Sequence, residues 1–161
     1  MGELGPDDPE EKHKAIMVVA RSYAKYYTDI AEKFPDMPYH LDDDPATSQK
    51  YNGYSLEKRS DYTVTAAKNT YGEVVTYKDN LIKTPYFSQS DGRTRSAEEV
   101  FGWKDTPYLK SVDDPYCKGL ELKGHGVGMS GCGSKGAAES GKKYKEILKY
   151  YYTGIDIEKA Y

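Results

Sequence analysis

One glycine-rich segment carries the polar side chains of this chain that are best suited to chemistry. Residues 124–136 read GHGVGMSGCGSKG, and His125, Ser130 and Cys132 lie among the glycines. Glycine lets a backbone adopt positive φ and approach a ligand closely. A loop with this much conformational freedom loses stability, and such a loss is usually tolerated at a functional site. We therefore expect a site in this loop, followed by an amphipathic helix that ends in tyrosines.

Several known chemistries fit this segment poorly. Its glycines match the dinucleotide pattern GxGxxG, but the βαβ unit and the acidic residue that such a site needs do not follow. Ser130 lies in GMSGC, one glycine short of a nucleophile elbow, and no GK[ST] follows for phosphate binding. His125 and Cys132 lack the third group that orients a thiol protease pair. The histidines and cysteines are too scattered for zinc, so we expect no metal and no cofactor.

The length favours a single domain, over residues 1–161, and the tyrosine content suits a carbohydrate ligand, although a half-buried structural tyrosine is the commoner case at any one position. The chain has 17 tyrosines, and a tyrosine ring can stack on a sugar while its hydroxyl reaches polar groups. A net charge of −3 and a pI near 5.7 argue against a nucleic-acid partner. No apolar run approaches the length of a membrane span, and residues 1–14 lack the pattern of a signal peptide.

The elements that position the loop begin with a helix from near Glu10 toward Lys33. Its apolar run from Ala15 to Ala20 covers every face, which predicts a buried helix. Lys14 and Arg21 lie two turns apart and therefore on one face. Each could pair structurally or serve a site.

The rest of the chain predicts a small sheet with long connections. Residues 34–60 form an irregular excursion, and residues 62–67 and 74–77 alternate as in a hairpin. We expect a third strand at 81–87, a helix at SAEEVFGW, a short strand at 120–123 and the final helix. The predicted fold is α+β: a single compact domain in which a buried N-terminal helix and a C-terminal helix pack on a small, mainly antiparallel sheet with long functional loops. Cys117 and Cys132 could form a disulfide or remain free.

Five segments, in this order, resemble the SpoIID/LytB family of cell-wall proteins. They are KAIMVVARSYAKYY, TYGEVVTY, YFSQSDGRTRSAEEVFGW, PYLKSVDDPY, and GHGVGMS with its following helix. The resemblance implies a peptidoglycan lytic transglycosylase that acts on glycan strands outside the cytoplasm. An alternative within the same family is a non-catalytic glycan-binding module that enhances a cell-wall amidase, which would then be its partner.

The resemblance also implies site residues. The implied catalytic set is Glu3, Arg21, Lys14 and Lys110. The implied substrate-binding set is Tyr108, His125, Ser130, Ser88, Ser90, Arg93, Gln49 and Tyr51. Glu3 would be the single general acid and base, because a lytic transglycosylase activates no water and a second carboxylate is not needed.

This sequence departs from the family pattern in three places. Residues 115–123 bridge a gap where family members usually continue for tens of residues, so we expect a shortened member, truncated also before Glu3. The loop reads SGC where the family usually has Ser-Gln-Tyr, and a disulfide of Cys117 could compensate. Only His40 remains of the histidine and cysteines that bind zinc in some members, so we expect no zinc site of that type.

Overall fold

The computed structural model describes residues 4–5, 7–44, 47–48 and 61–161. Its elements, in chain order, are α1 (Glu10–Asp29), α3 (Asp61–Asn69), β1 (Glu73–Tyr77), β2 (Asn80–Leu81), β3 (Tyr86–Phe87), α4 (Ala97–Phe101), the 3-10 turn η1 (Pro115–Cys117), β4 (Met129–Ser130), α5 (Gly131–Glu139), α6 (Tyr144–Tyr151) and β5 (Asp156–Lys159). They form one α+β domain, as the sequence predicted.

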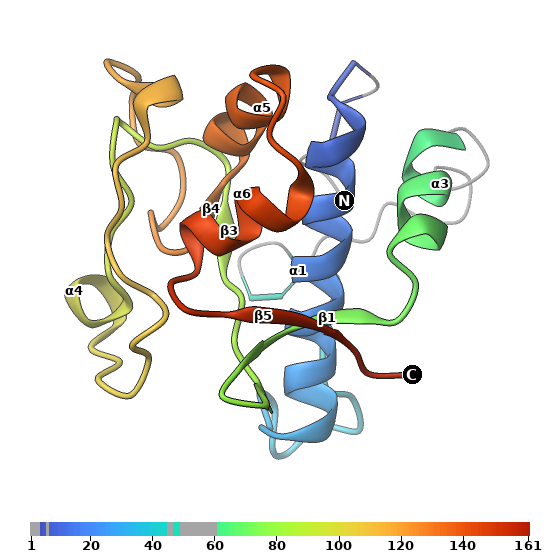
Figure 1. Ribbon diagram of the computed structural model, residues 1–161. Helices are drawn as coiled ribbons and strands as arrows, with labels where there is room; N and C mark the ends of the chain where they lie inside the picture. Colours follow the sequence, from blue (N-terminus) through green and yellow to red (C-terminus); the bar gives the residue numbers. More distant parts are fainter. Residues whose placement is uncertain (1–3, 6, 45–46, 49–60) are drawn as a thin grey trace.

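Helix α1 is the central element of the fold. Pro9 precedes it, and Glu10 and Glu11 in its first turn complement the helix dipole. The side chains from Ala15 to Val19 are at most 7% exposed, because α3, β1, α5 and α6 all contact this helix (Figure 1). The prediction of a buried N-terminal helix is confirmed. The helix ends at Asp29 rather than near Lys33.

The sheet is small and mostly antiparallel. β1 lies between β2 and β5, and both pairings are antiparallel. A separate parallel pair joins β3 to β4, with Tyr86 opposite Met129. In Figure 1 the β1–β5 pair crosses α1.

Three predictions about strands are wrong. Residues 62–67 belong to helix α3, where Thr63 and Ala66 are buried one turn apart, so the helical period prevails over the apparent alternation. Residues 81–87 contain only the end of β2 and the short β3. Residues 118–122 form an exposed turn, and at 123 a single bridge joins Lys123 to Gln89.

The C-terminal region contains two helices rather than one. Gly141, with φ of +94°, lies between α5 and α6. Gly131, Gly133 and Gly136 belong to α5, so the expected loop ends at Ser130. A Cβ at Gly133 would collide with a carboxylate oxygen of Asp114 and with the Tyr151 hydroxyl. Close packing therefore explains this glycine, not loop flexibility.

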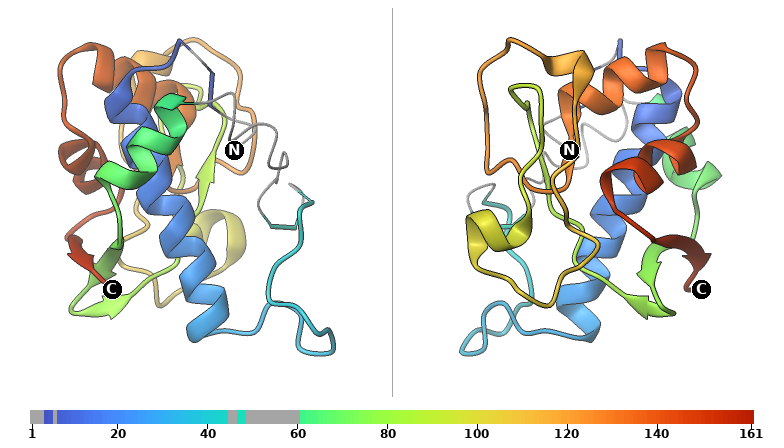
Figure 2. Two further views of the ribbon diagram at one scale, coloured as in Figure 1. Left: turned by 90° about the vertical axis from the view of Figure 1, so that its right-hand side faces the viewer. Right: turned by 60° about the vertical axis from the view of Figure 1, so that its left-hand side comes forward.

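The segment between β3 and β4 forms the side of the molecule that Figure 2 (right) brings forward. It consists mainly of irregular chain, in which α4 and η1 are the helical elements described. Among the described residues, no helix has the length and apolar character needed to cross a membrane.

Candidate functional site

Two segments far apart in the sequence meet where β3 pairs with β4. We call residues 88–93 the serine turn and residues 124–130 the signature loop. Cys132 lies two residues beyond the end of the signature loop. Its N–H donates to the Ser88 carbonyl at 3.0 Å. On the other side, Arg95 N–H donates to the Gly126 carbonyl at 2.8 Å. The two segments are therefore held together through residues that flank them, Arg95 after the serine turn and Cys132 after the signature loop.

The signature loop lies close to the backbone before β3. Gly128 has φ of +79°, and a Cβ there would collide with the Pro85 carbonyl oxygen. The buried Tyr152 hydroxyl donates to the same carbonyl at 2.7 Å and accepts from the Met129 N–H at 3.3 Å. Only glycine fits at position 128 without strain.

His125 orders the signature loop from within. Its Nδ1 accepts a hydrogen bond from the Val127 N–H at 3.0 Å, so the neutral ring carries its proton on Nε2. Burial lowers the pKa of His125, and the Tyr86 carbonyl is its backbone partner. The ring also contacts Phe87 and Phe101, with centroids 5.7 and 5.3 Å away. His125 is therefore neutral near pH 7 and half-buried.

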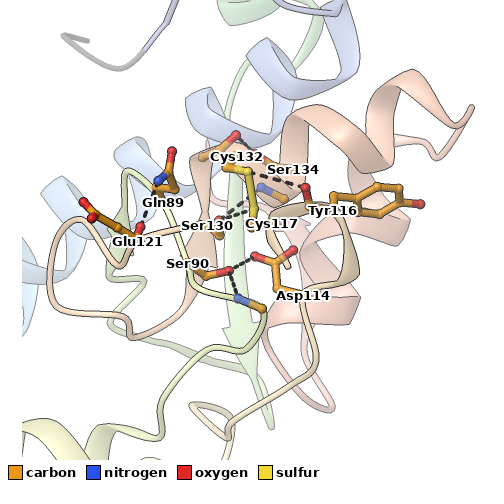
Figure 3. Close-up of a disulfide and its surroundings, with 12 residues drawn as sticks. Gln89, Ser90, Asp114, Tyr116, Cys117, Glu121, Ser130, Cys132 and Ser134 are labelled. Atoms are coloured by element: carbon orange, nitrogen blue, oxygen red, sulfur yellow. Dashed lines mark hydrogen bonds between the residues drawn. A yellow bond between two sulfur atoms is a disulfide. The ribbon is translucent and has the colours of Figure 1, made fainter. Parts of the chain in front are cut away.

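Ser130 and a disulfide fix the start of α5 (Figure 3). The Ser130 hydroxyl accepts from the Gly133 N–H at 3.1 Å, which caps the helix. Cys117 and Cys132 form the disulfide, with Cα atoms 6.2 Å apart, and it joins η1 to α5. The sequence left this pairing open. Ser130 is fully buried. Its hydroxyl therefore caps α5 and does not face solvent.

A buried carboxylate that the sequence analysis did not single out lies beneath the serine turn. Asp114 is fully buried, and it accepts from the Ser90 hydroxyl at 2.7 Å and from the Tyr151 hydroxyl at 3.0 Å. Burial raises the pKa of Tyr151, which keeps this hydroxyl protonated as a donor. The available signal was the sequence DDP, because an aspartate before proline often begins a turn. Asp114 connects the serine turn, η1 and α6.

The other predicted site residues, which include Lys110 of the predicted catalytic set, divide by exposure. Ser88, Arg93 and Lys110 are exposed, and Arg93 pairs with Glu99 at 3.0 Å. Tyr108 is only 6% exposed and packs against Tyr77. Tyr108 is therefore part of the core, and its predicted role in substrate binding stays a prediction.

Lys14 and Arg21 already have partners within the fold. Lys14 pairs with Glu10 at 2.8 Å and with Glu11 at 3.1 Å, and the hydrogen bond to Glu10 raises its pKa. The Arg21 guanidinium donates to the carbonyls of Thr70 and Glu73 at 2.7 and 2.8 Å. These contacts make Arg21 a positioning residue for the α3–β1 connection. Its predicted role in catalysis stays a prediction.

Glu3, Gln49 and Tyr51 lie outside the described residues. The segment that follows Glu3 is described, however, and it contacts α5. Asp8 pairs with Lys12 at 2.7 Å and with Lys135 of α5 at 3.3 Å. The start of α1 and the helix capped by Ser130 are therefore neighbours.

Comparisons with known proteins agree with the resemblance. Residues 1–77 match the profile of the family described as SpoIID, Stage II sporulation protein. An uncharacterized protein of Brachyspira hyodysenteriae is 27% identical over 239 aligned residues, which cover 96% of this chain and 63% of that protein. Stage II sporulation protein D of Bacillus amyloliquefaciens is 26% identical over 208 residues, which cover 74% of this chain and 60% of that protein. The amidase enhancer of Bacillus subtilis is 58% identical over 34 residues, 21% of this chain and 5% of that protein.

Length distinguishes this chain from these relatives. It spans about 60% of the length of the two that match most of it. The 239 aligned positions of the first exceed the 161 residues of this chain, so that relative carries residues that this chain lacks.

Proposed function

The chain belongs to the SpoIID family of stage II sporulation proteins, and from this premise we propose that it is a lytic transglycosylase of peptidoglycan. Family membership and the partial similarity to an amidase enhancer fit a cell-wall role. The proposed place of action is therefore outside the cytoplasm, at the wall.

The proposed reaction breaks the bond between N-acetylmuramic acid and N-acetylglucosamine. Glu3 donates its proton to the glycosidic oxygen as the bond to the anomeric carbon breaks. The C6 hydroxyl of the same muramic residue then attacks that carbon and returns a proton to the Glu3 carboxylate. The products are a 1,6-anhydro-muramic end and a free sugar hydroxyl. No water is consumed, so one carboxylate is sufficient.

One observation carries the proposal. Three of the five segments that resemble the family, which are separate in sequence, converge around the start of α5: the serine turn, the segment with Asp114, and the signature loop. The segment after Glu3 adjoins the same helix through the ion pair of Asp8 and Lys135. Of the predicted site residues in the second half of the chain, Ser88, Arg93 and Lys110 are exposed and His125 is half-buried.

The contacts of Lys14 also fit a Glu3 that must be protonated to act. An unpaired cation beside a carboxyl group lowers the pKa of that group and disfavours the acid form. Lys14 is paired with two carboxylates, those of Glu10 and Glu11. The charge of Lys14 is therefore offset within the first turns of α1.

A second candidate function is an amidase enhancer that binds glycan without cleaving it. The observation in its favour is the 58% identity over 34 residues to the amidase enhancer of Bacillus subtilis. The two functions differ in their need for Glu3, because binding could survive without this carboxylate and cleavage could not.

Mass spectrometry of peptide-free glycan strands after incubation tests the proposal. The wild type should release anhydro-muramic products, Glu3→Gln should release none, and the matched variant Glu139→Gln, at an exposed position of α5, should act as the wild type. Reducing-end products would show hydrolysis and contradict the mechanism. Intact strands that nevertheless retain the protein on sedimentation would favour the enhancer.

A further inference from the structure

Aromatic rings and two lysines form a continuous surface strip that begins beside the signature loop and extends away from it. We call it the aromatic–lysine strip. Its members are Tyr23, Tyr26, Tyr27, Lys33, Lys83, Phe101 and Trp103, all half-buried or exposed. They come from the second half of α1, the turn after it, the connection between β2 and β3, and the end of α4. Four separate parts of the chain therefore build one surface.

Each step along the strip is a direct contact. Lys83 Nζ lies 4.2 Å from the ring centroid of Trp103 and 6.0 Å from that of Tyr27. Lys33 Nζ lies 5.1 Å from the same Tyr27 ring. In the other direction, Trp103 contacts Phe101 at 4.6 Å between centroids, and Phe101 contacts His125 at 5.3 Å. The strip therefore reaches the signature loop.

The two lysines of this strip are held mainly by contacts with uncharged groups in the part of the chain that the structure describes. Neither lysine forms an ion pair with a described carboxylate. Lys33 donates instead to the Tyr23 hydroxyl at 2.5 Å and to the Thr47 carbonyl, with Asp42 as the acidic group whose charge acts on it. Burial lowers the pKa of both lysines, and the charge of Lys33 lowers that of Lys83 further. Two partly dehydrated cations that share one aromatic ring favour an anionic ligand.

We propose that the aromatic–lysine strip binds a carboxylated amino sugar, with the rings stacking on sugar faces and Lys33 and Lys83 holding the carboxylate. The aromatic rings suit a ligand with apolar sugar faces, and the two cations suit a ligand with a negative charge. A neutral glycan has the sugar faces but not the charge. The identity of the sugar rests on the proposed function. In peptidoglycan the carboxylate is the lactyl group of N-acetylmuramic acid, which is free wherever no peptide is attached.

Isothermal titration calorimetry with two tetrasaccharides tests this site. One is a peptide-free repeat of N-acetylglucosamine and N-acetylmuramic acid, and the other is the neutral chitin tetrasaccharide. Both are titrated into the Glu3→Gln chain to prevent turnover. We expect the carboxylated sugar to bind about 10-fold more tightly, as expected for one charge-assisted contact.

Variants then assign the preference to the strip. The double variant Lys33→Gln and Lys83→Gln should lose the preference and keep its affinity for the chitin tetrasaccharide, whereas Lys83→Arg should retain the preference. The control pair Lys68→Gln and Lys118→Gln removes the same charge at exposed positions and should change nothing. Trp103→Ala should weaken both sugars. Circular dichroism confirms that each variant is folded.

Equal affinity for the two sugars, or a preference that survives the double variant, would overturn the proposal. The proposed function is tested by a different measurement, because it fails if the wild type releases no anhydro products. In that case a calorimetric preference for the carboxylated sugar would still support the binding site on the strip.

Discussion

Removing one hydroxyl from the buried Asp114 network should cost measurable stability. In Tyr151→Phe the ring stays, so no cavity forms, and only the 3.0 Å hydrogen bond to the carboxylate is lost. A hydrogen bond to a charged group contributes about 1.5–3 kcal/mol. For a domain of this size about 2 kcal/mol corresponds to a fall in Tm of roughly 4–8 °C. Urea unfolding and a thermal scan, both followed by circular dichroism, measure the change.

The neighbouring tyrosine provides a matched control. Tyr150 is 47% exposed, against 2% for Tyr151, and its hydroxyl donates to the Asp113 carbonyl at 2.6 Å. Water can replace that bond, so Tyr150→Phe should lower the free energy of unfolding by less than about 1 kcal/mol. If the two variants lose the same stability, the buried network does not hold the serine turn to α6 as inferred.

Three further predictions concern other contacts. Replacing Cys117 and Cys132 together by serine should lower the free energy of unfolding by about 3 kcal/mol, because a disulfide that closes a loop of this length reduces the entropy of the unfolded chain. An unchanged urea midpoint would contradict a stabilising role for the disulfide. Because burial lowers the pKa of both His13 and His125 below 6.5, the unfolded chain takes up protons first, so stability should fall as pH drops below about 6.5; a urea midpoint at pH 5.5 equal to or above that at pH 7.5 would refute this. Arg21→Gln should lower the free energy of unfolding by about 1–3 kcal/mol, because two carbonyls lose their donor; lost turnover with an unchanged Tm would instead show that its role is purely catalytic.

Local patterns account for the elements that the sequence predicted correctly. The apolar run from Ala15 to Val19 identified the central helix, and SAEEVF identified α4, where the Ser96 hydroxyl accepts from the Glu99 N–H as its cap. In both cases the signal lies within a few residues of the element. The glycine-rich signature loop was found in the same way, although its last glycines belong to α5.

Pairings between distant residues account for the elements that were missed. β1 pairs with β5, so that Glu73 lies opposite Lys159, and no local pattern at residues 73–77 identifies that partner. The site shows the same limit. Asp114 is 24 residues from Ser90 and 37 from Tyr151, and only the fold brings the three together. Ser90 therefore has a structural partner that the sequence analysis did not foresee.

The exposed turn at residues 118–122 makes this domain tolerant of added chain. Both ends of the turn are fixed, at Cys117 by the disulfide and at Lys123 by its bridge to Gln89. Between them, an added Cβ at Gly119 would meet no atom within 4 Å, and Leu120 is 44% exposed. Lengthening such a loop costs only about 0.6 kcal/mol for each doubling. Evolution, or a protein engineer, could thus insert or delete an entire accessory lobe at this point while the core and the signature loop keep their geometry.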